Sequence, residues 1–237
     1  MLHSFAPSCL PSITSTHPLP VSPLYPLDED ISGIDGTCSN ATYAILRDMH
    51  ELTKAFLARW NYIGGPCPRS SDTGFAEDME KIHKRLLNRP SFRDDVKQDW
   101  IYESCRLAAL IYCRSILHGM PLADSANAAH AESPAGTNSS KLTIKGALRH
   151  ALESTDRWNH WGNMSGVFLW VCLIGGAGSI QDRSQEARIN KCFALYAMQC
   201  AIVNTSKHAN AMIESQRTML WVQHLTNLKC GILSLRN

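Results

Sequence analysis

Several signatures of common functional classes are missing from the sequence. Its nine cysteines include no C-x-x-C pair, the usual mark of a structural zinc site. Its ten histidines include no pair spaced three or four residues apart, which excludes a zincin-type metal helix. The 23 basic and 21 acidic residues leave a formal charge of only +2, whereas nucleic-acid-binding modules normally carry a basic surplus. We therefore expect no bound metal, no cofactor and no sequence-specific DNA contact.

Long apolar runs are also scarce. The first 26 residues hold six prolines and no lysine or arginine, whereas a secretory signal peptide needs a basic start and an unbroken apolar stretch. The longest uncharged apolar stretch, 164–180, has 17 residues and is short for a bilayer span. We interpret it as a buried core helix and expect no membrane contact. Cysteines in apolar surroundings, such as Cys113, are expected to be inert free thiols of a reducing compartment.

Helical periodicity is what the sequence does contain. Residues 1–38 are rich in Pro, Ser and Thr and are predicted to be disordered. Between 39 and 237, apolar residues recur at the spacing of helices and no hairpin signal interrupts them. The pattern predicts an all-α bundle or array of about seven helices, with a mobile loop at about 120–140. These helices are expected near 42–60, 75–86, 91–119, 142–152, 165–174, 184–203 and 209–228.

The helix predicted over 91–119 has the clearest end signals. Ser91 is a suitable N-cap, and Asp94 and Asp95 place negative charge in the first turn. Gly119 is a suitable C-terminal cap, followed by Pro121. Because most of its circumference is apolar, we expect this helix at the centre of the bundle.

The same acidic pair offers an enzymatic alternative. Asp94 and Asp95 resemble the aspartate-rich box of helical terpene synthases, in which paired carboxylates hold magnesium against a diphosphate. That chemistry needs a second metal-binding motif on a facing helix, and the sequence shows none. Capping and helix-dipole charge explain both aspartates without a metal. We therefore predict that the chain is not an enzyme, with a terpene-synthase type of enzyme as the alternative.

Polar residues in an apolar setting are the candidates for ligand binding. Glu103 and Arg106 lie three residues apart on the predicted central helix, so they either form an intrahelical ion pair or anchor a ligand. Together with Trp100 and Trp161 they define the predicted pocket for a small effector. Four aromatic residues form either a second pocket or part of the core: Trp158, Trp161, Phe168 and Trp170.

Two longer segments carry a family resemblance. They are 99–112 (DWIYESCRLAALIY) and 161–176 (WGNMSGVFLWVCLIGG), with shorter echoes at 151–156, 192–196 and 216–220. Together they resemble the regulatory "middle homology" region of fungal-specific transcription factors, and the similarity runs from about 43 to 225.

The resemblance implies a helical domain that modulates transcription in the nucleus, with the cytoplasm as the alternative. Its implied partners are proteins of the transcription machinery, a dimer mate, or a small-molecule effector. The family's DNA-binding module uses six cysteines, spaced C-x2-C-x6-C, to hold two zinc ions, and this sequence lacks that cluster. The chain is thus expected to act without direct DNA contact. A truncated paralogue without function is the remaining alternative.

Overall fold

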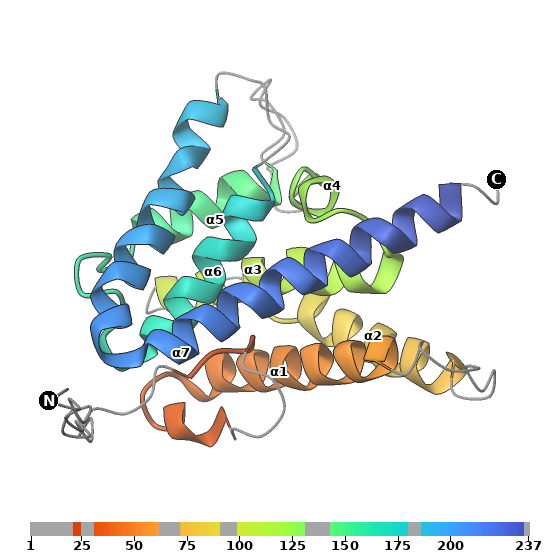
Figure 1. Cartoon of the computed structure of the whole chain (residues 1–237), viewed down its shortest axis with the longest axis horizontal. Helices are drawn as coiled ribbons and strands as arrows, with labels where there is room; N and C mark the ends of the chain where they lie inside the picture. Colours follow the sequence, from red (N-terminus) through yellow and green to blue (C-terminus); the bar gives the residue numbers. More distant parts are fainter. Residues whose placement is uncertain are drawn as a thin grey trace, which may run out of the picture.

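The computed structural model describes residues 21–24, 31–61, 72–90, 99–130, 143–179 and 186–234. The predicted all-α class is confirmed, since the described residues form helices and a single isolated antiparallel bridge between Ala129 and Thr143. Figure 1 shows the helices stacked around α3 and α6. In chain order the elements are η1 (Ile31–Ile34), α1 (Asn40–Asn61), α2 (Asp72–Leu87), α3 (Trp100–His118), α4 (Leu122–Ala126), α5 (Ile144–Glu153), η5 (Gly162–Met164), α6 (Ser165–Ala177) and α7 (Glu186–Ser234).

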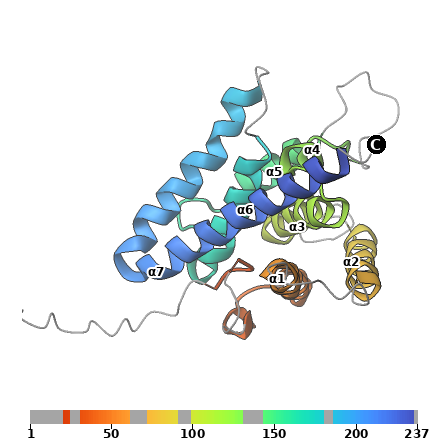
Figure 2. The ribbon, with the colours of Figure 1, turned by 45° about the vertical axis from the view of Figure 1, so that its right-hand side comes forward.

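Helix α3 lies at the centre, as predicted from its apolar circumference. It packs against α1, α2, α4, α5 and α6, and every residue from Tyr102 to Cys113 is buried. A buried hydrogen bond of 2.9 Å joins Thr53 Oγ1 on α1 to Tyr112 Oη on α3, and the Tyr112 ring meets Trp170 of α6 edge-on. The view in Figure 2 shows α3 enclosed by its neighbours.

The ends of α3 show one correct and one wrong prediction. The helix begins at Trp100, and its N-cap is Asp99, whose Oδ1 accepts a hydrogen bond of 2.9 Å from the Tyr102 amide. Asp99, and not Ser91, is therefore the N-cap of α3, since its carboxylate satisfies a free amide of the first turn; Ser91 itself lies outside the described residues. At the other end Gly119, with φ of 59°, is the predicted C-terminal cap.

Helix α6 is the core helix expected from the long apolar run. Nearly all of its residues are buried, including Phe168 and Trp170. It is also the main support of α7. The two helices meet closely at Gly175, where an added Cβ would lie 2.5 Å from Phe193 Cδ1. Glycine at this position lets the Phe193 ring lie directly on the backbone of α6.

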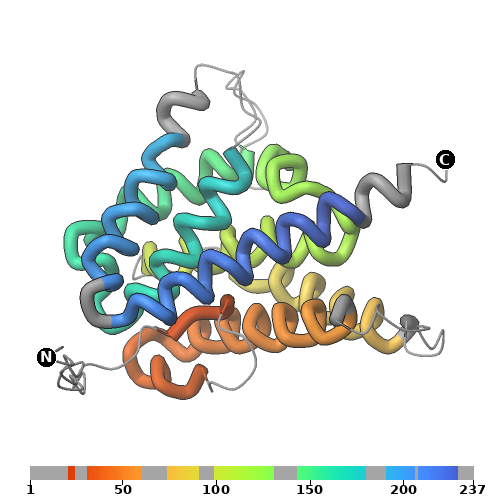
Figure 3. The backbone as a smooth tube through the Cα atoms, viewed as in Figure 1, coloured from red at the N-terminus to blue at the C-terminus, as the bar shows by residue number. Residues whose placement is uncertain are grey.

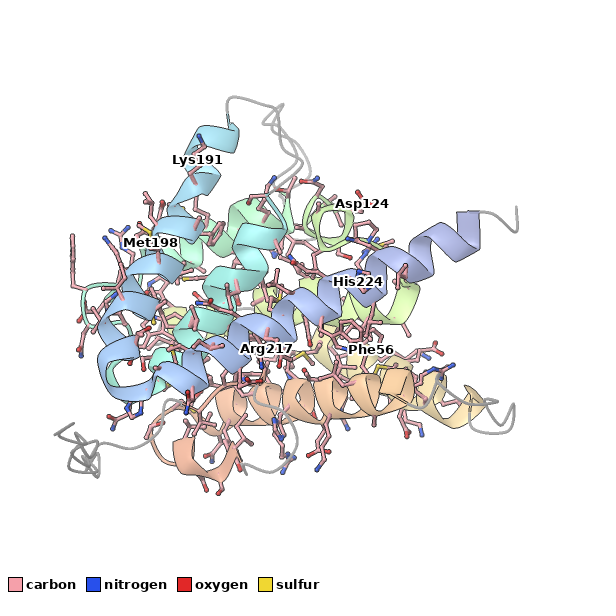
Figure 4. The ribbon with its side chains drawn as sticks, viewed as in Figure 1. Phe56, Asp124, Lys191, Met198, Arg217 and His224 are labelled. Carbon is pink, nitrogen blue, oxygen red and sulfur yellow. The ribbon has the colours of Figure 1, made fainter. Side chains whose placement is uncertain are left out.

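Helix α7 consists of two arms. His208, with φ of −138° and ψ of 43°, is non-helical and divides the 49 residues into a first arm before it and a second arm after it. The tube in Figure 3 follows the chain through this change of direction. The two arms correspond to the separate helices predicted at 184–203 and 209–228. Figure 4 marks the first arm with Lys191 and Met198, and the second with Arg217 and His224.

Two segments differ from the sequence-based expectation. Inside the segment predicted to be disordered, Val21, Leu24, Ile31 and Ile34 are buried in the core, and η1 packs on α1. The folded part therefore begins before residue 39, because these aliphatic side chains have apolar surface to bury; residues 1–20 and 25–30 lie outside the description. Inside the predicted loop, 122–126 form the short helix α4, while 131–140 are not described.

Candidate functional site

Glu103 and Arg106 form a buried ion pair in the first two turns of α3. Arg106 Nε donates to Glu103 Oε2 and Nη2 donates to Oε1, both at 2.8 Å. The two side chains are only 2% and 5% exposed. This bidentate geometry is the strongest form of an arginine–carboxylate contact. Both carboxylate oxygens of Glu103 thus accept hydrogen bonds from Arg106, which is the intrahelical ion pair that was one of the two alternatives expected from the sequence.

The two tryptophans of the predicted effector pocket, Trp100 and Trp161, contact different residues. Trp100 meets the His150 ring of α5 edge-on, with 5.4 Å between ring centroids. Trp161 is buried against Phe168, and its Nε1 donates to Thr155 Oγ1 at 2.9 Å. The structure therefore places Trp100 beside the ion pair on α3 and Trp161 in the turn before α6. Neither of the clefts described below is lined by these residues, and their binding of an effector stays a prediction.

A cleft of about 300 Å³ lies between the turn that contains residues 157–160 and the first arm of α7. Arg157 Nη1 donates a hydrogen bond to Tyr196 Oη, and its guanidinium carbon lies 5.3 Å from the centre of the Tyr196 ring. The indole of Trp158 is 86% exposed. The lining therefore combines a cation, aromatic surface and hydrogen-bonding groups. Its described residues are Arg157, Trp158, His160, Tyr196, Gln199 and Val203.

The backbone of this turn is strained. His160, Trp161 and Gly162 have φ values of 44°, 60° and 57°, a left-handed run in which each non-glycine residue costs about 1–2 kcal/mol. The Trp161 contacts with Thr155 and Phe168 hold the turn in this form. The His160 ring also packs edge-on against Phe168, and its partial burial lowers the pKa of the imidazole. His160 is thus neutral near pH 7 and offers one donor and one acceptor nitrogen.

Both arms of α7 expose large apolar side chains. Eight large apolar side chains on its two arms are 45–66% exposed, and an open groove of about 490 Å³ runs along the first arm and reaches Gln216 on the second. No charged residue occurs from 192 to 206. We call this the α7 apolar surface, and it consists of Leu195, Met198, Ile202, Val203, Ile213, Leu220, Trp221 and Leu228.

Four thiols of the core have pKa values raised by burial. Cys105 and Cys172 are fully buried, and burial raises the pKa of both. Burial raises the pKa of Cys113 and Cys200 to about 12, the direction expected for Cys113 from its apolar neighbours. Within the described ranges, no group of three His, Cys, Asp or Glu residues could hold a metal ion. Asp94 and Asp95 lie outside these ranges, so the structure does not test the terpene-synthase alternative.

Sequence reasoning did not select the residues of the cleft. It named Trp158 as a possible lining residue but paired it with Trp161, Phe168 and Trp170, which are core side chains. The signal that could have found the cleft is the local sequence Arg157-Trp-Asn-His-Trp161, which gathers a cation, an imidazole and two indoles within five residues. Tyr196 and Gln199 come from a different helix and gave no such signal.

A scan of known protein families, a search of curated proteins and a search of solved structures each returned no match. Among the described helices, none combines the length and apolarity that crossing a membrane requires. The similarity to the fungal transcription factors accordingly stays a prediction.

Proposed function

We propose that this chain is a regulatory domain of the fungal transcription-factor type that acts in the nucleus by assembling with a second copy of itself through the α7 apolar surface. The all-helical architecture supports the proposal. The two segments that carry the resemblance, 99–112 and 161–176, form most of α3 and α6, the two central helices. The resemblance therefore concerns the part of the chain that determines the packing of the bundle.

The observation that carries the proposal is the area of exposed apolar surface on α7. At roughly 150–250 Å² for a large side chain, the exposed fractions of its eight residues amount to roughly 600–1,000 Å². Stable protein interfaces bury about 800 Å² on each partner. The surface thus has the area that one half of a dimer interface requires.

A second copy is the partner that fits the charge pattern best. Specific binding to a different protein normally uses complementary charges around an apolar centre. The first arm of α7 offers no charge between Lys191 and Lys207, so it has little with which to select an oppositely charged partner. In a two-fold dimer the same patch meets itself, and an uncharged apolar face does so without like-charge repulsion. On the second arm Glu214 and Arg217 form an exposed ion pair beside Ile213 and Leu220, and the pair carries no net charge.

The test is the oligomeric state of the full chain by sedimentation velocity. We expect a dimer at micromolar concentration that becomes a monomer when Ile202, which is 66% exposed, is replaced by glutamate. The matched control is Leu87→Glu, which places the same charge on a 58% exposed leucine at the end of α2 and should leave the dimer intact. A monomeric wild-type chain at tens of micromolar, or an Ile202→Glu variant that dimerises normally, would overturn the proposal.

The transcriptional role needs a separate measurement. The full chain is fused to a heterologous DNA-binding domain, and the output of a reporter gene is compared for the wild type, Ile202→Glu and Leu87→Glu. We expect the fusion to change reporter output and the Ile202→Glu variant to lose this effect, while Leu87→Glu retains it. A wild-type fusion with no effect on the reporter would refute the transcriptional role. The dimer proposal would not be affected, because sedimentation velocity tests it separately.

A further inference from the structure

We infer that the cleft between residues 157–160 and the first arm of α7 is a binding site for a planar aromatic carboxylate. Its volume of about 300 Å³ lies at the lower end of the range for small-molecule sites. A ligand with one or two fused rings and one carboxylate is of this size. The inference uses the proposed function in regarding such a ligand as an effector, and the two sites adjoin, because Val203 belongs both to the cleft and to the α7 apolar surface.

Arg157 is the group that would bind the carboxylate. Its guanidinium carries five N–H donors in a fixed plane, and the interactions with Tyr196 engage Nη1 and one face of the group. The remaining donors stay available for an oxygen anion. The described lining of the cleft contains one cation, Arg157, and no aspartate or glutamate. The hydroxyl of Tyr196 positions the guanidinium before any ligand arrives.

Trp158 is the group that would cover the aromatic ring. An indole that is 86% exposed leaves most of its apolar surface in water, which is unfavourable unless a ligand covers it. Val203 on α7 adds apolar surface to the same cleft, and His160 and Gln199 add hydrogen-bonding groups. This arrangement of a few polar groups beside apolar walls is typical of small-molecule sites.

The strained turn keeps these groups in place. Backbone strain of this kind persists only where the surroundings determine the conformation, and it often occurs at binding sites. The His160 amide donates to the Arg157 carbonyl at 3.2 Å, and Thr155 receives the Trp161 indole N–H while its own hydroxyl donates to the Leu152 carbonyl at 2.7 Å. These hydrogen bonds fix the turn at both ends, so ligand binding loses little conformational entropy in ordering it.

The test is isothermal titration of the full chain with 2-naphthoate, and with the uncharged 2-naphthamide as the matched ligand. We expect saturable binding of 2-naphthoate, weakened about tenfold or more for the amide or in the Arg157→Gln variant, since both remove a charged hydrogen bond. Trp158→Ala should weaken it about fivefold through lost stacking. Leu87→Ala removes an exposed apolar side chain of α2, outside both the cleft and the α7 apolar surface, and should leave the affinity unchanged.

A second measurement protects the result against variants that fail to fold. In the nuclear magnetic resonance spectrum of the wild-type chain, 2-naphthoate should shift the indole N–H signal of Trp158 and leave that of Trp221 in place. Absence of saturable binding up to about 5 mM, equal affinity for the amide, or an unmoved Trp158 signal would overturn the inference. The same titration on a Leu220→Glu variant, whose new charge lies on the second arm of α7 and not among the lining residues of the cleft, keeps its outcome separate from that of the dimer proposal.

Discussion

Replacing Glu103 by glutamine removes the charge from one partner of the buried ion pair on α3. The side chain keeps its size and one carbonyl oxygen, but the Arg106 guanidinium, only 5% exposed, loses its carboxylate. One of the two hydrogen bonds of 2.8 Å loses its acceptor, because the glutamine side chain has one acceptor oxygen and an NH2 group that only donates. The surrounding residues of α3 are buried, so water cannot replace the missing charge without opening the core.

The expected loss of stability is about 3–5 kcal/mol, the usual result of leaving one charge of a buried pair uncompensated. For a chain of 237 residues this corresponds to a fall in melting temperature of roughly 6–20 °C. The double variant Glu103→Leu/Arg106→Met removes both charges and fills the space with apolar side chains. It should lose less stability than the single variant, because no buried charge remains.

Urea unfolding followed by circular dichroism at 222 nm measures both effects, provided that the transition is two-state. An unchanged slope with a lower midpoint identifies a loss of stability alone. A single variant that loses less than about 1 kcal/mol would show that the pair is solvated, contrary to its burial. A double variant less stable than the single one would also refute the reasoning.

Three further predictions concern packing, capping and thiol reactivity. Gly175→Ala forces a Cβ to 2.5 Å from the Phe193 ring and should lower the free energy of unfolding in urea by about 1–3 kcal/mol. Gly176→Ala, whose added Cβ has its nearest contact at 3.9 Å, should be neutral or slightly stabilising. Equal losses of stability in the two variants would contradict the close contact at Gly175. Asp99→Ala removes the cap of α3 and should lower stability by about 1 kcal/mol, with Asn as the variant that restores it. Since burial raises the Cys113 pKa to about 12, its alkylation in the native protein at pH 8 should be roughly a thousandfold slower than in urea, and mass spectrometry showing equal rates would disprove this.

The sequence was sufficient to predict the fold class and most helix positions. Apolar spacing located α1, α2, α3, α5, α6 and both arms of α7 because each of these helices buries a stripe or a whole surface. The cap at Asp99 was missed because Ser91 also satisfies the pattern, and only tertiary packing decides where a helix starts. Helix α4 was missed because five residues are too few to show a period.

The candidate site could not be predicted in the same way. Periodicity reports that a residue is apolar but not which side of a helix another helix covers, so it did not indicate that residues of α7 such as Ile202 are exposed. The cleft beside Arg157 depends on residues 39 positions apart, Arg157 and Tyr196, and on a left-handed backbone at two non-glycine residues. Neither property leaves a local pattern in the sequence.

The break at His208 allows α7 to form two shorter arms that run in different directions. An unbroken helix of 49 residues would be a rod about 74 Å long. A compact domain of this size has a radius of gyration of about 18 Å, so such a rod would extend well beyond the bundle. One residue with non-helical dihedral angles allows the chain to turn back over the bundle (Figure 3). The break also makes the angular position of side chains about the helix axis independent in the two arms. An insertion or deletion in one arm would therefore change which residues of that arm face the core, without changing those of the other arm.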